Sequence, residues 1–245
     1  MKQVFFSIIT ATKNPENILP SLKSLENQNI KNYENIIIDS SSKPLKKKIK
    51  DKFNFRYFYN KKLSLYQALN FGIKNSRGKV IFFLHSDDIL NNKEILNKVE
   101  KIFKKNKSHI VYGDIKMFSN KLKRVWKPGN FVKKKIYAGW HPPHTAFFCK
   151  KKLFNKFGLF NTNYSIASDY DLMLRLLLSV EVQKIKYISL PIVKMKIGGK
   201  SNKSIKNIIK SNLEVIKILK AFKIDNYLKI IFFKLLSKIF QIRFK

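Results

Sequence analysis

Two neighbouring carboxylates follow one of the most apolar segments of this 245-residue chain. Val80–Leu84 is a run of five apolar residues, and His85, Ser86, Asp87 and Asp88 come directly after it. Acids are scarce, because the chain has 51 Lys and Arg against 15 Asp and Glu. Adjacent carboxylates can hold Mg²⁺ or Mn²⁺, whose remaining coordination sites take diphosphate oxygens. A turn and a helix cap are the plainer use of the same pair.

Polar side chains also follow the other apolar runs near the start of the chain. Thr10 and Thr12 end the first run, Asp39 ends the second, and Asn60 follows the third. In open α/β sheets, ligands bind at the carboxyl ends of the strands. We therefore expect hydroxyls and three carboxylates to gather at one edge of a sheet. Neither GxGxxG nor GxxxxGK[ST] occurs, so phosphate must be bound in another way.

Strands and helices alternate through the first ninety residues. The buried strands are expected at 4–10, 35–39, 55–59 and 80–84, and Gly78 precedes the last of them. Asn14 and Pro15 are typical of a helix start, and a second helix is expected from Leu65. This alternation predicts an α/β fold with a doubly wound, mostly parallel sheet flanked by helices.

The second half of the chain is less regular. An amphipathic helix is expected over 95–103 and a strand over 109–115, whereas 116–140 is expected to be irregular. The segment Leu172–Leu178 is apolar nearly all round, which indicates a central helix. Asp169 and Asp171 lie at its start, where carboxylates suit the helix dipole.

The net charge of +36 has several ordinary explanations, among them nucleic acid and an anionic membrane. Because the Lys residues are spread through nearly every segment, the charge is weak evidence for nucleic acid. A basic nucleic-acid-binding α/β protein remains the alternative from another class, although no binding motif supports it. The lone Cys149 excludes an internal disulfide and a cysteine zinc cluster. No signal segment or apolar membrane span is visible, which predicts a cytoplasmic location.

Six stretches in this order resemble family 2 glycosyltransferases of the GT-A fold: "SIITATKN", "IIID", "LYQALNFGIKNSRGKVIFFLHSDD", "VYGD", "HPPHTAFF" and "SDYDLMLRL". The likeness is greatest to the bacterial branch that builds cell-surface polysaccharides, and it covers about residues 3–200. It implies an inverting, metal-dependent enzyme that moves a sugar from a nucleotide-diphospho-sugar, expected to be a UDP-sugar. The acceptor would be a hydroxyl of a lipid-linked or polysaccharide molecule. We expect a catalytic domain at 1–200, with a nucleotide-binding half at 1–90 and an acceptor half at 91–200.

The resemblance implies a set of donor-binding residues. Thr10, Thr12 and Asp39 would hold the base and ribose. Asp88 would ligate Mg²⁺ or Mn²⁺, while Asp87 would contact the nucleotide or assist with the metal. A glycine-serine segment that closes over the donor is matched by Gly198, Gly199 and Ser201.

On the acceptor side, the resemblance implies that Asp169 is the general base and that His144 lies near the sugar. Asp171 is the residue most easily confused with the base, and His144 in its Pro-Pro loop could equally be structural. Arg175 is expected to pair with a nearby Asp. The chain lacks acids that the family often has at or near three positions. This leaves open that the protein is a family member with weakened catalysis that serves as a subunit. The positions are Lys43, Ser64 and Gln67.

The segment 201–245 is basic, with eleven Lys and Arg against Glu214 and Asp225. A basic amphipathic helix is typical of proteins that lie on an anionic membrane, here the inner face of the cell membrane. The alternative is that its apolar stripe packs on the catalytic domain or on a second subunit of a homo-oligomer. The stripe consists of Leu228, Ile231, Phe232, Leu235, Leu236 and Ile239.

Overall fold

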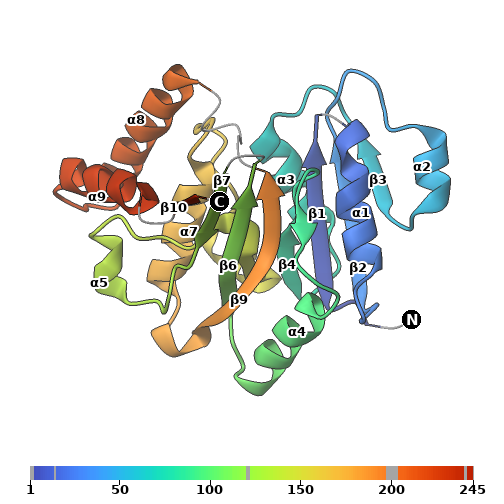
Figure 1. The fold of residues 1–245 in the computed structure, drawn as a ribbon, viewed down its shortest axis with the longest axis horizontal. Helices are drawn as coiled ribbons and strands as arrows, with labels where there is room; N and C mark the ends of the chain where they lie inside the picture. Colours follow the sequence, from blue (N-terminus) through green and yellow to red (C-terminus); the bar gives the residue numbers. More distant parts are fainter. Residues whose placement is uncertain (1–2, 14, 120–121, 197–203, 240–241, 245) are drawn as a thin grey trace.

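The computed structural model describes residues 3–13, 15–119, 122–196, 204–239 and 242–244, and it contains a mixed β-sheet with helices around it (Figure 1). The strand order is β10-β7-β6-β8-β4-β1-β2-β3, and β9 pairs with both β6 and β5. The strands are β1 (Phe6–Thr12), β2 (Tyr33–Asp39), β3 (Arg56–Tyr59), β4 (Val80–Phe83), β5 (Ile89–Leu90), β6 (Ile110–Phe118), β7 (Leu122–Trp126), β8 (Phe147–Lys150), β9 (Ile185–Lys196) and β10 (Ile242–Phe244).

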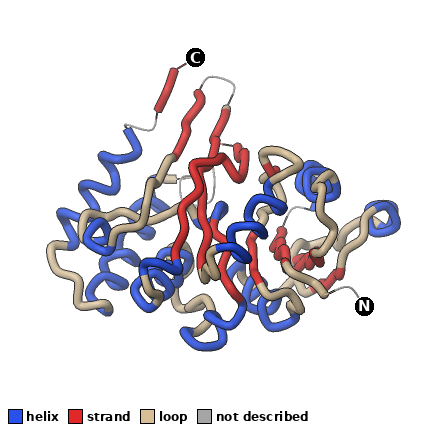
Figure 2. Tube along the Cα trace, turned by 90° about the horizontal axis from the view of Figure 1, so that it is seen from below, coloured by secondary structure: helices blue, strands red, loops and turns tan. Residues whose placement is uncertain are grey.

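Helices cover both faces of the sheet, and strands form the middle layer (Figure 2). Alternate residues of β1 belong to different core clusters: Ile9 packs in the cluster that contains residues of α3 and α7, whereas Phe6 and Ile8 pack in the cluster that contains residues of α4. The helices are α1 (Leu19–Glu26), α2 (Lys47–Lys52), α3 (Leu65–Asn75), α4 (Ile95–Lys105), α5 (Lys133–Ile136), α6 (Lys151–Phe157), α7 (Ser168–Ser179), α8 (Ile205–Ala221) and α9 (Tyr227–Ile239), with 3₁₀ turns at Pro15–Ile18, His144–Ala146 and Val182–Lys184.

The first half of the sheet confirms the predicted parallel arrangement. Strands β3, β2, β1 and β4 lie in that order, and each neighbouring pair is parallel. Strands β2 and β3 follow on one side of β1, and β4 lies on its other side. The carboxyl ends of β1 and β4 therefore form the topological switch point, where such folds bind ligands. Every residue of β1 is buried, as expected for a strand covered on both faces.

The second half differs from the expectation at 116–140. Strand β7 lies in that stretch and pairs antiparallel with β6. Its sequence is too basic to be recognised as a strand, and its partner strand supplies the hydrogen bonds that define it. Strand β8 joins β4 and β6, antiparallel to both.

Two helix starts differ from simple sequence expectations. The helix expected from Pro15 begins as a 3₁₀ turn, and α1 itself starts at Leu19 with a proline in its first turn; Asn14 lies outside the described residues. Helix α3 begins with a capping box, in which the side chains of Ser64 and Gln67 each accept a hydrogen bond from the other's backbone N–H. Two of the departures from the family pattern therefore have a local role, since they stabilise the start of α3.

Part of the basic segment 201–245 packs on the rest of the molecule. Val215, Ile218 and Leu219 of α8 are fully buried in the same core cluster as residues of α7. The two helices α8 and α9 lie at one end of the molecule (left in Figure 1). A domain boundary near residue 200 stays a prediction. Among the described helices, none is long and apolar enough to cross a membrane.

Candidate active site

The switch point between β1 and β4 is held together by Thr10. Its hydroxyl donates to the carbonyl oxygen of Leu84 over 2.8 Å, and its side chain is buried. Thr12, two residues further along β1, is also buried, and its carbonyl oxygen accepts from the backbone N–H of Ser40. In this structure Thr10 fixes the start of the loop that carries the Asp pair, and contact of either threonine with a nucleotide stays a prediction.

Asp39 is completely buried and its carboxylate is fully occupied by the protein. Oδ1 accepts from the N–H and hydroxyl of Ser41 at 2.9 and 2.5 Å. Oδ2 accepts from the N–H of Leu45 at 3.0 Å and from the hydroxyl of Tyr57 at 2.7 Å. Asp39 therefore organises the loop after β2 from within, and a direct contact with the base or ribose would require it to exchange one of these bonds.

The Asp pair after β4 is divided between solvent and interior. Asp87 is exposed, whereas Asp88 is only 1% exposed and its N–H closes a turn on the carbonyl of His85. The Oδ2 atom of Asp88 is buried without a hydrogen-bond partner. Burial, together with the nearby charge of Asp87, holds the pKa of Asp88 well above its usual range. Among the described residues, Asp88 is the only acid with a buried side-chain oxygen in this state, and a bound ion or water is one physical explanation for such an atom.

This unpartnered oxygen suits a divalent cation. Mg²⁺ is commonly bound by one or two carboxylates, with water and substrate phosphates as its other ligands. Asp88 and Asp87 offer such a partial ligand set. Across the part of the chain that the structure describes, no group of three or more His, Cys, Asp or Glu could hold a metal by itself. A cation here would thus depend on the donor's diphosphate to complete its coordination.

The structure brings together three side chains from separate elements in a hydrogen-bonded chain. The Nδ1 atom of His144 lies 3.1 Å from Oδ2 of Asp169, and its Nε2 lies 2.9 Å from Nε2 of His85. Asp169 is at the start of α7, His144 is in the turn before β8, and His85 follows β4. Because both ring nitrogens of His144 face side chains, this histidine links Asp169 to the loop that carries Asp87 and Asp88.

The hydrogen-bond directions among Asp169, His144 and His85 depend on which ring nitrogens carry protons. Burial, and then the neighbouring His144, lower the pKa of His85 to about 3, so this ring stays neutral at pH 7. When His144 is also neutral, its Nδ1–H donates to Asp169 and its Nε2 accepts from Nε2–H of His85. His144 thus fixes the orientation of the Asp169 carboxylate.

Asp169 keeps an accessible carboxylate, with a side chain 25% exposed. Its Oδ1 accepts from the N–H of Tyr170 at 2.9 Å and lies 3.5 Å from the hydroxyl of Tyr66. Asp171, the competing candidate, instead forms an ion pair with Arg175. The guanidinium of Arg175 also donates to two backbone carbonyls, so the expected internal ion pair is confirmed and Asp171 has a structural role.

Sequence reasoning did not identify His85 and Tyr66 as members of the site. His85 lies between the apolar strand and the Asp pair, a position that could have marked it. Nothing in the sequence marked Tyr66 as a site residue, because it is one aromatic residue among the apolar residues of helix α3. The remaining predicted donor residues lie outside the described residues; they are Gly198, Gly199 and Ser201.

A profile of the family described as "Glycosyl transferase family 2" matches residues 7–167, about two thirds of the chain. The chain belongs to this family. A "PGL/p-HBAD biosynthesis glycosyltransferase" of Mycobacterium bovis is 28% identical over 183 residues, which cover 71% of this chain and 70% of that protein. An uncharacterized glycosyltransferase of Rickettsia typhi is 29% identical over 184 residues, covering 70% of this chain and 58% of that protein.

Solved structures share the fold. S. aureus TarS 1–349 in complex with UDP-GlcNAc superposes with a TM-score of 0.68 at 19% identity, covering 88% of this chain and 66% of that one. The mannosyltransferase PcManGT from Pyrobaculum calidifontis, in complex with GDP-Man and Mn²⁺, gives a TM-score of 0.60 at 14% identity, covering 86% and 64%. The predicted GT-A fold and the predicted family are therefore confirmed.

Proposed function

We propose that this chain transfers a sugar from a nucleotide-diphospho-sugar to an acceptor hydroxyl with inversion at the anomeric carbon, and that Asp169 is the general base. The observation that supports this most strongly is the accessible carboxylate of Asp169, oriented by His144 beside the β1–β4 switch point. Two proteins of the same fold were solved with nucleotide-sugars, UDP-GlcNAc and GDP-Man. We propose a UDP-sugar as the donor, and a lipid-linked or polysaccharide acceptor.

In the proposed reaction the acceptor oxygen attacks the anomeric carbon from the side opposite the diphosphate. Its proton passes to the carboxylate of Asp169 as the new C–O bond forms. The bond between the anomeric carbon and the diphosphate oxygen breaks, and the nucleoside diphosphate leaves with the electron pair. The bonds from His144 and from the N–H of Tyr170 hold the carboxylate in one orientation before attack, which lowers the entropic cost of reaching the transition state.

Asp88 and Asp87 are the residues that would hold a divalent cation in this account. When bound, such a cation stabilises the negative charge that develops on the departing diphosphate. The buried, unpartnered Oδ2 of Asp88 supports this assignment, and the Mn²⁺ in the PcManGT complex is a parallel in a protein of the same fold. What this chain supplies is a carboxylate kept out of bulk solvent at the carboxyl end of β4.

The test is the variant Asp169→Asn, which keeps the size of the side chain and loses its basicity. The donor class is first found by thermal shift with a panel of nucleoside diphosphates and their sugars, with and without Mn²⁺, because a ligand stabilises the fold by mass action. With that donor, we expect the variant to lose a factor of roughly 10²–10⁴ in transfer rate while its nucleotide binding is unchanged. Asp51→Asn, on the exposed face of α2, is the matched control. A fully active Asp169→Asn enzyme would show that another group is the base.

We also propose that helices α8 and α9 place the enzyme on an anionic membrane, where lipid-linked acceptors would lie. Leu228 and Phe232, one helical turn apart on α9, are 70% and 61% exposed. Three further apolar residues of α8 are exposed at the same spacing, and lysines lie beside them. Exposed apolar side chains mixed with lysines suit a headgroup interface. These α8 residues are Ile205, Ile209 and Leu213.

The membrane proposal is tested by co-sedimentation with anionic and neutral lipid vesicles. The double variant Leu228→Gln, Phe232→Gln should bind anionic vesicles several-fold more weakly than the wild type. Val182→Gln, which also replaces an exposed apolar side chain, is the control. Equal binding by all three proteins would refute the proposal, and a dimer that the double variant alone fails to form would assign the surface to a second subunit.

A further inference from the structure

One acid of the basic segment, Glu214 of α8, reaches the loop that precedes Asp169. Its Oε1 accepts from the N–H and the hydroxyl of Ser165 at 2.9 and 2.8 Å. Its Oε2 accepts from the N–H of Ile166 at 2.9 Å and from the N–H of Ala167 at 2.8 Å. Three successive backbone N–H groups, immediately before the helix that carries Asp169, therefore converge on one carboxylate.

Glu214 is built into this position as a charged group. The residue is only 8% exposed. Burial acts to raise the pKa of Glu214, but the backbone bonds from Ser165, Ala167 and Ile166 outweigh it, so the pKa lies below its ordinary value. Glu214 is thus a carboxylate at neutral pH, and its hydrogen bonds are of the strong, charge-assisted kind.

The start of helix α7 lacks the side-chain bond of an ordinary N-cap residue. Its N-cap residue is Ala167, which makes no side-chain capping bond, and alanine is among the poorest N-cap residues. A carboxylate near a helix N-terminus also interacts favourably with the helix dipole. Glu214, 47 residues beyond Ala167 in the sequence, instead binds the three N–H groups just before α7, and it adds a carboxylate near the helix N-terminus to those of Asp169 and Asp171.

The same loop is held on its other side by Tyr66 of α3. The hydroxyl of Tyr66 donates to the carbonyl oxygen of Ile166 over 2.5 Å and lies 3.5 Å from Oδ1 of Asp169. Burial, and then the charges of Asp169 and Glu214, raise the pKa of Tyr66, so this hydroxyl stays a donor. The segment 165–167 is therefore held by hydrogen bonds from α3 on one side and α8 on the other. Asp169 follows this segment by two residues.

We propose that Glu214 is a positioning residue for Asp169: it fixes the loop 165–167 and thereby sets where the base stands relative to the acceptor. This inference rests on the proposed function, since it concerns the base of that reaction. It makes α8 part of the catalytic unit as well as part of the basic segment. The expected signature is a loss of kcat without a loss of donor binding.

The test is Glu214→Gln, which keeps the shape but turns part of the acceptor group into an NH₂ donor that faces backbone N–H groups. A small displacement of a catalytic group can cost up to about 10²-fold in rate, so we expect kcat to fall by roughly 10- to 100-fold. The KM for the nucleotide-sugar and the nucleotide-induced thermal shift should stay within about twofold, because the donor residues are not touched. Glu214→Asp keeps the charge with a shorter reach and should recover part of the rate. Asp225→Asn, the other acid of 201–245 and exposed, should match the wild type.

A second measurement separates this proposal from the proposed function. Hydrogen exchange at the amides of Ile166 and Ala167 should be faster in Glu214→Gln, whether or not a transfer assay exists. A wild-type protein without transferase activity would defeat the proposed function but leave that exchange result intact. If the Gln variant does not fold, the Asp variant decides: a lower kcat at unchanged KM supports the proposal. A folded Gln variant with wild-type kcat and wild-type exchange at these amides overturns it, and if only the Asp variant folds, wild-type kcat and exchange in that variant overturn it.

Discussion

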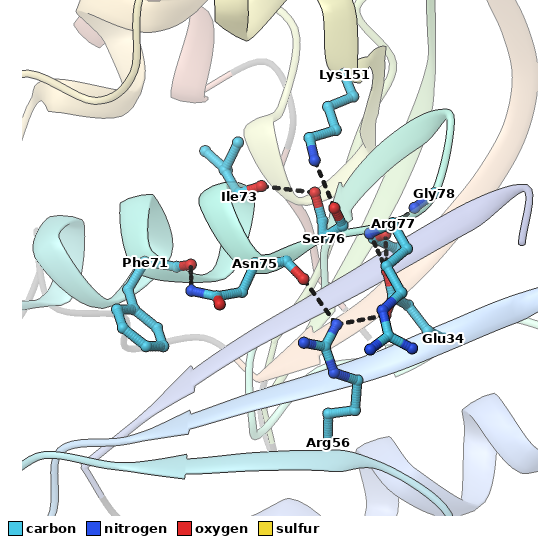
Figure 3. Close-up of polar contacts among 10 residues, drawn as sticks. Glu34, Arg56, Phe71, Ile73, Asn75, Ser76, Arg77, Gly78 and Lys151 are labelled. Atoms are coloured by element: carbon cyan, nitrogen blue, oxygen red, sulfur yellow. Dashed lines mark hydrogen bonds and ion pairs between the residues drawn. The ribbon is translucent and has the colours of Figure 1, made fainter.

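Glu34, which is half-buried, and Asp88, which is buried, are acids at opposite ends of one set of parallel strands. Glu34 lies near the start of β2, and its carboxylate is surrounded by donors (Figure 3). The hydroxyl of Ser7 donates to it over 2.6 Å, the guanidinium of Arg56 pairs with it at 2.8 Å, and the N–H of Arg77 also donates to it. Asp88 follows β4 at the other end, and one of its oxygens has no partner.

The amino end of the sheet is also closed by the chain itself. A Cβ added to Gly78, just before β4, would lie 2.5 Å from the backbone nitrogen of Ser7, so this turn tolerates no side chain. Arg56 donates again to the carbonyl of Asn75 over 2.7 Å, and Lys151 donates to the carbonyl of Ser76 (Figure 3). Every group that this end presents to Glu34 is a donor from the protein.

The difference shows in the pKa values of the two acids. For Glu34, burial acts to raise the pKa, but the hydrogen bonds from Ser7, Arg77 and Arg56 outweigh it and lower the pKa. For Asp88, burial and Asp87 raise the pKa with no compensating donor. The fold satisfies the carboxylate of Glu34, whereas it leaves one oxygen of Asp88 without a partner. The comparison teaches that, of these two acids, the one at the binding end is the one whose hydrogen-bonding capacity the protein leaves unmet, although Asn32 and Asn35 at the amino end also have a buried side-chain oxygen without a partner.

The largest stability effect should come from the satisfied acid. Glu34→Gln removes the charge that Ser7, Arg56 and Arg77 stabilise, and hydrogen bonds to charged groups contribute about 1.5–3 kcal/mol, so we expect a loss of about 2 kcal/mol in the free energy of unfolding. Urea unfolding at pH 7 measures it, with Glu26→Gln on the exposed surface of α1 as the control. Donor KM should not change. An unchanged free energy of unfolding in Glu34→Gln would show that the network in Figure 3 contributes no net stability.

A smaller effect follows from pH. Because the pKa of Glu34 is lowered in the folded protein, its stabilisation is present above the ordinary glutamate pKa and is lost as pH falls through the lowered value. The difference in unfolding free energy between wild type and Glu34→Gln should therefore shrink as the pH is lowered from 7 into the acid range. A difference that grows on acidification would reverse the sign of the argument.

Much of the parallel half could be predicted from the sequence, because buried parallel strands are continuous apolar runs and their polar ends fall on one edge. Asp169 and His144 were predicted as site residues through the family resemblance, and their contact with each other needed the structure. The places of His85 and Glu214 could not be predicted, since each contacts a partner more than 40 residues away in the sequence. Strand β7 was not predicted, because its basic sequence shows no strand pattern and the strand is defined by its pairing with β6.

The capping box of α3 makes a related point. Ser64 and Gln67 depart from the family's acidic pattern, which by sequence alone suggested a weakened donor site. In the structure they cap a helix, so their identity has a local physical reason. Whether the lost negative charge also changes donor choice stays a prediction.

The central claim is that Asp88 is left unsatisfied by the fold because it binds a cation with the donor. The direct test is the thermal midpoint of wild type, Asp88→Asn and Glu34→Gln, each with and without Mn²⁺ and the nucleoside diphosphate that stabilises the wild type most. Without ligand, Asp88→Asn should melt at or above the wild-type temperature, and Glu34→Gln below it. With ligand, Glu34→Gln should keep the Mn²⁺-dependent rise and Asp88→Asn should lose it. An undiminished Mn²⁺-dependent rise in Asp88→Asn would contradict the account.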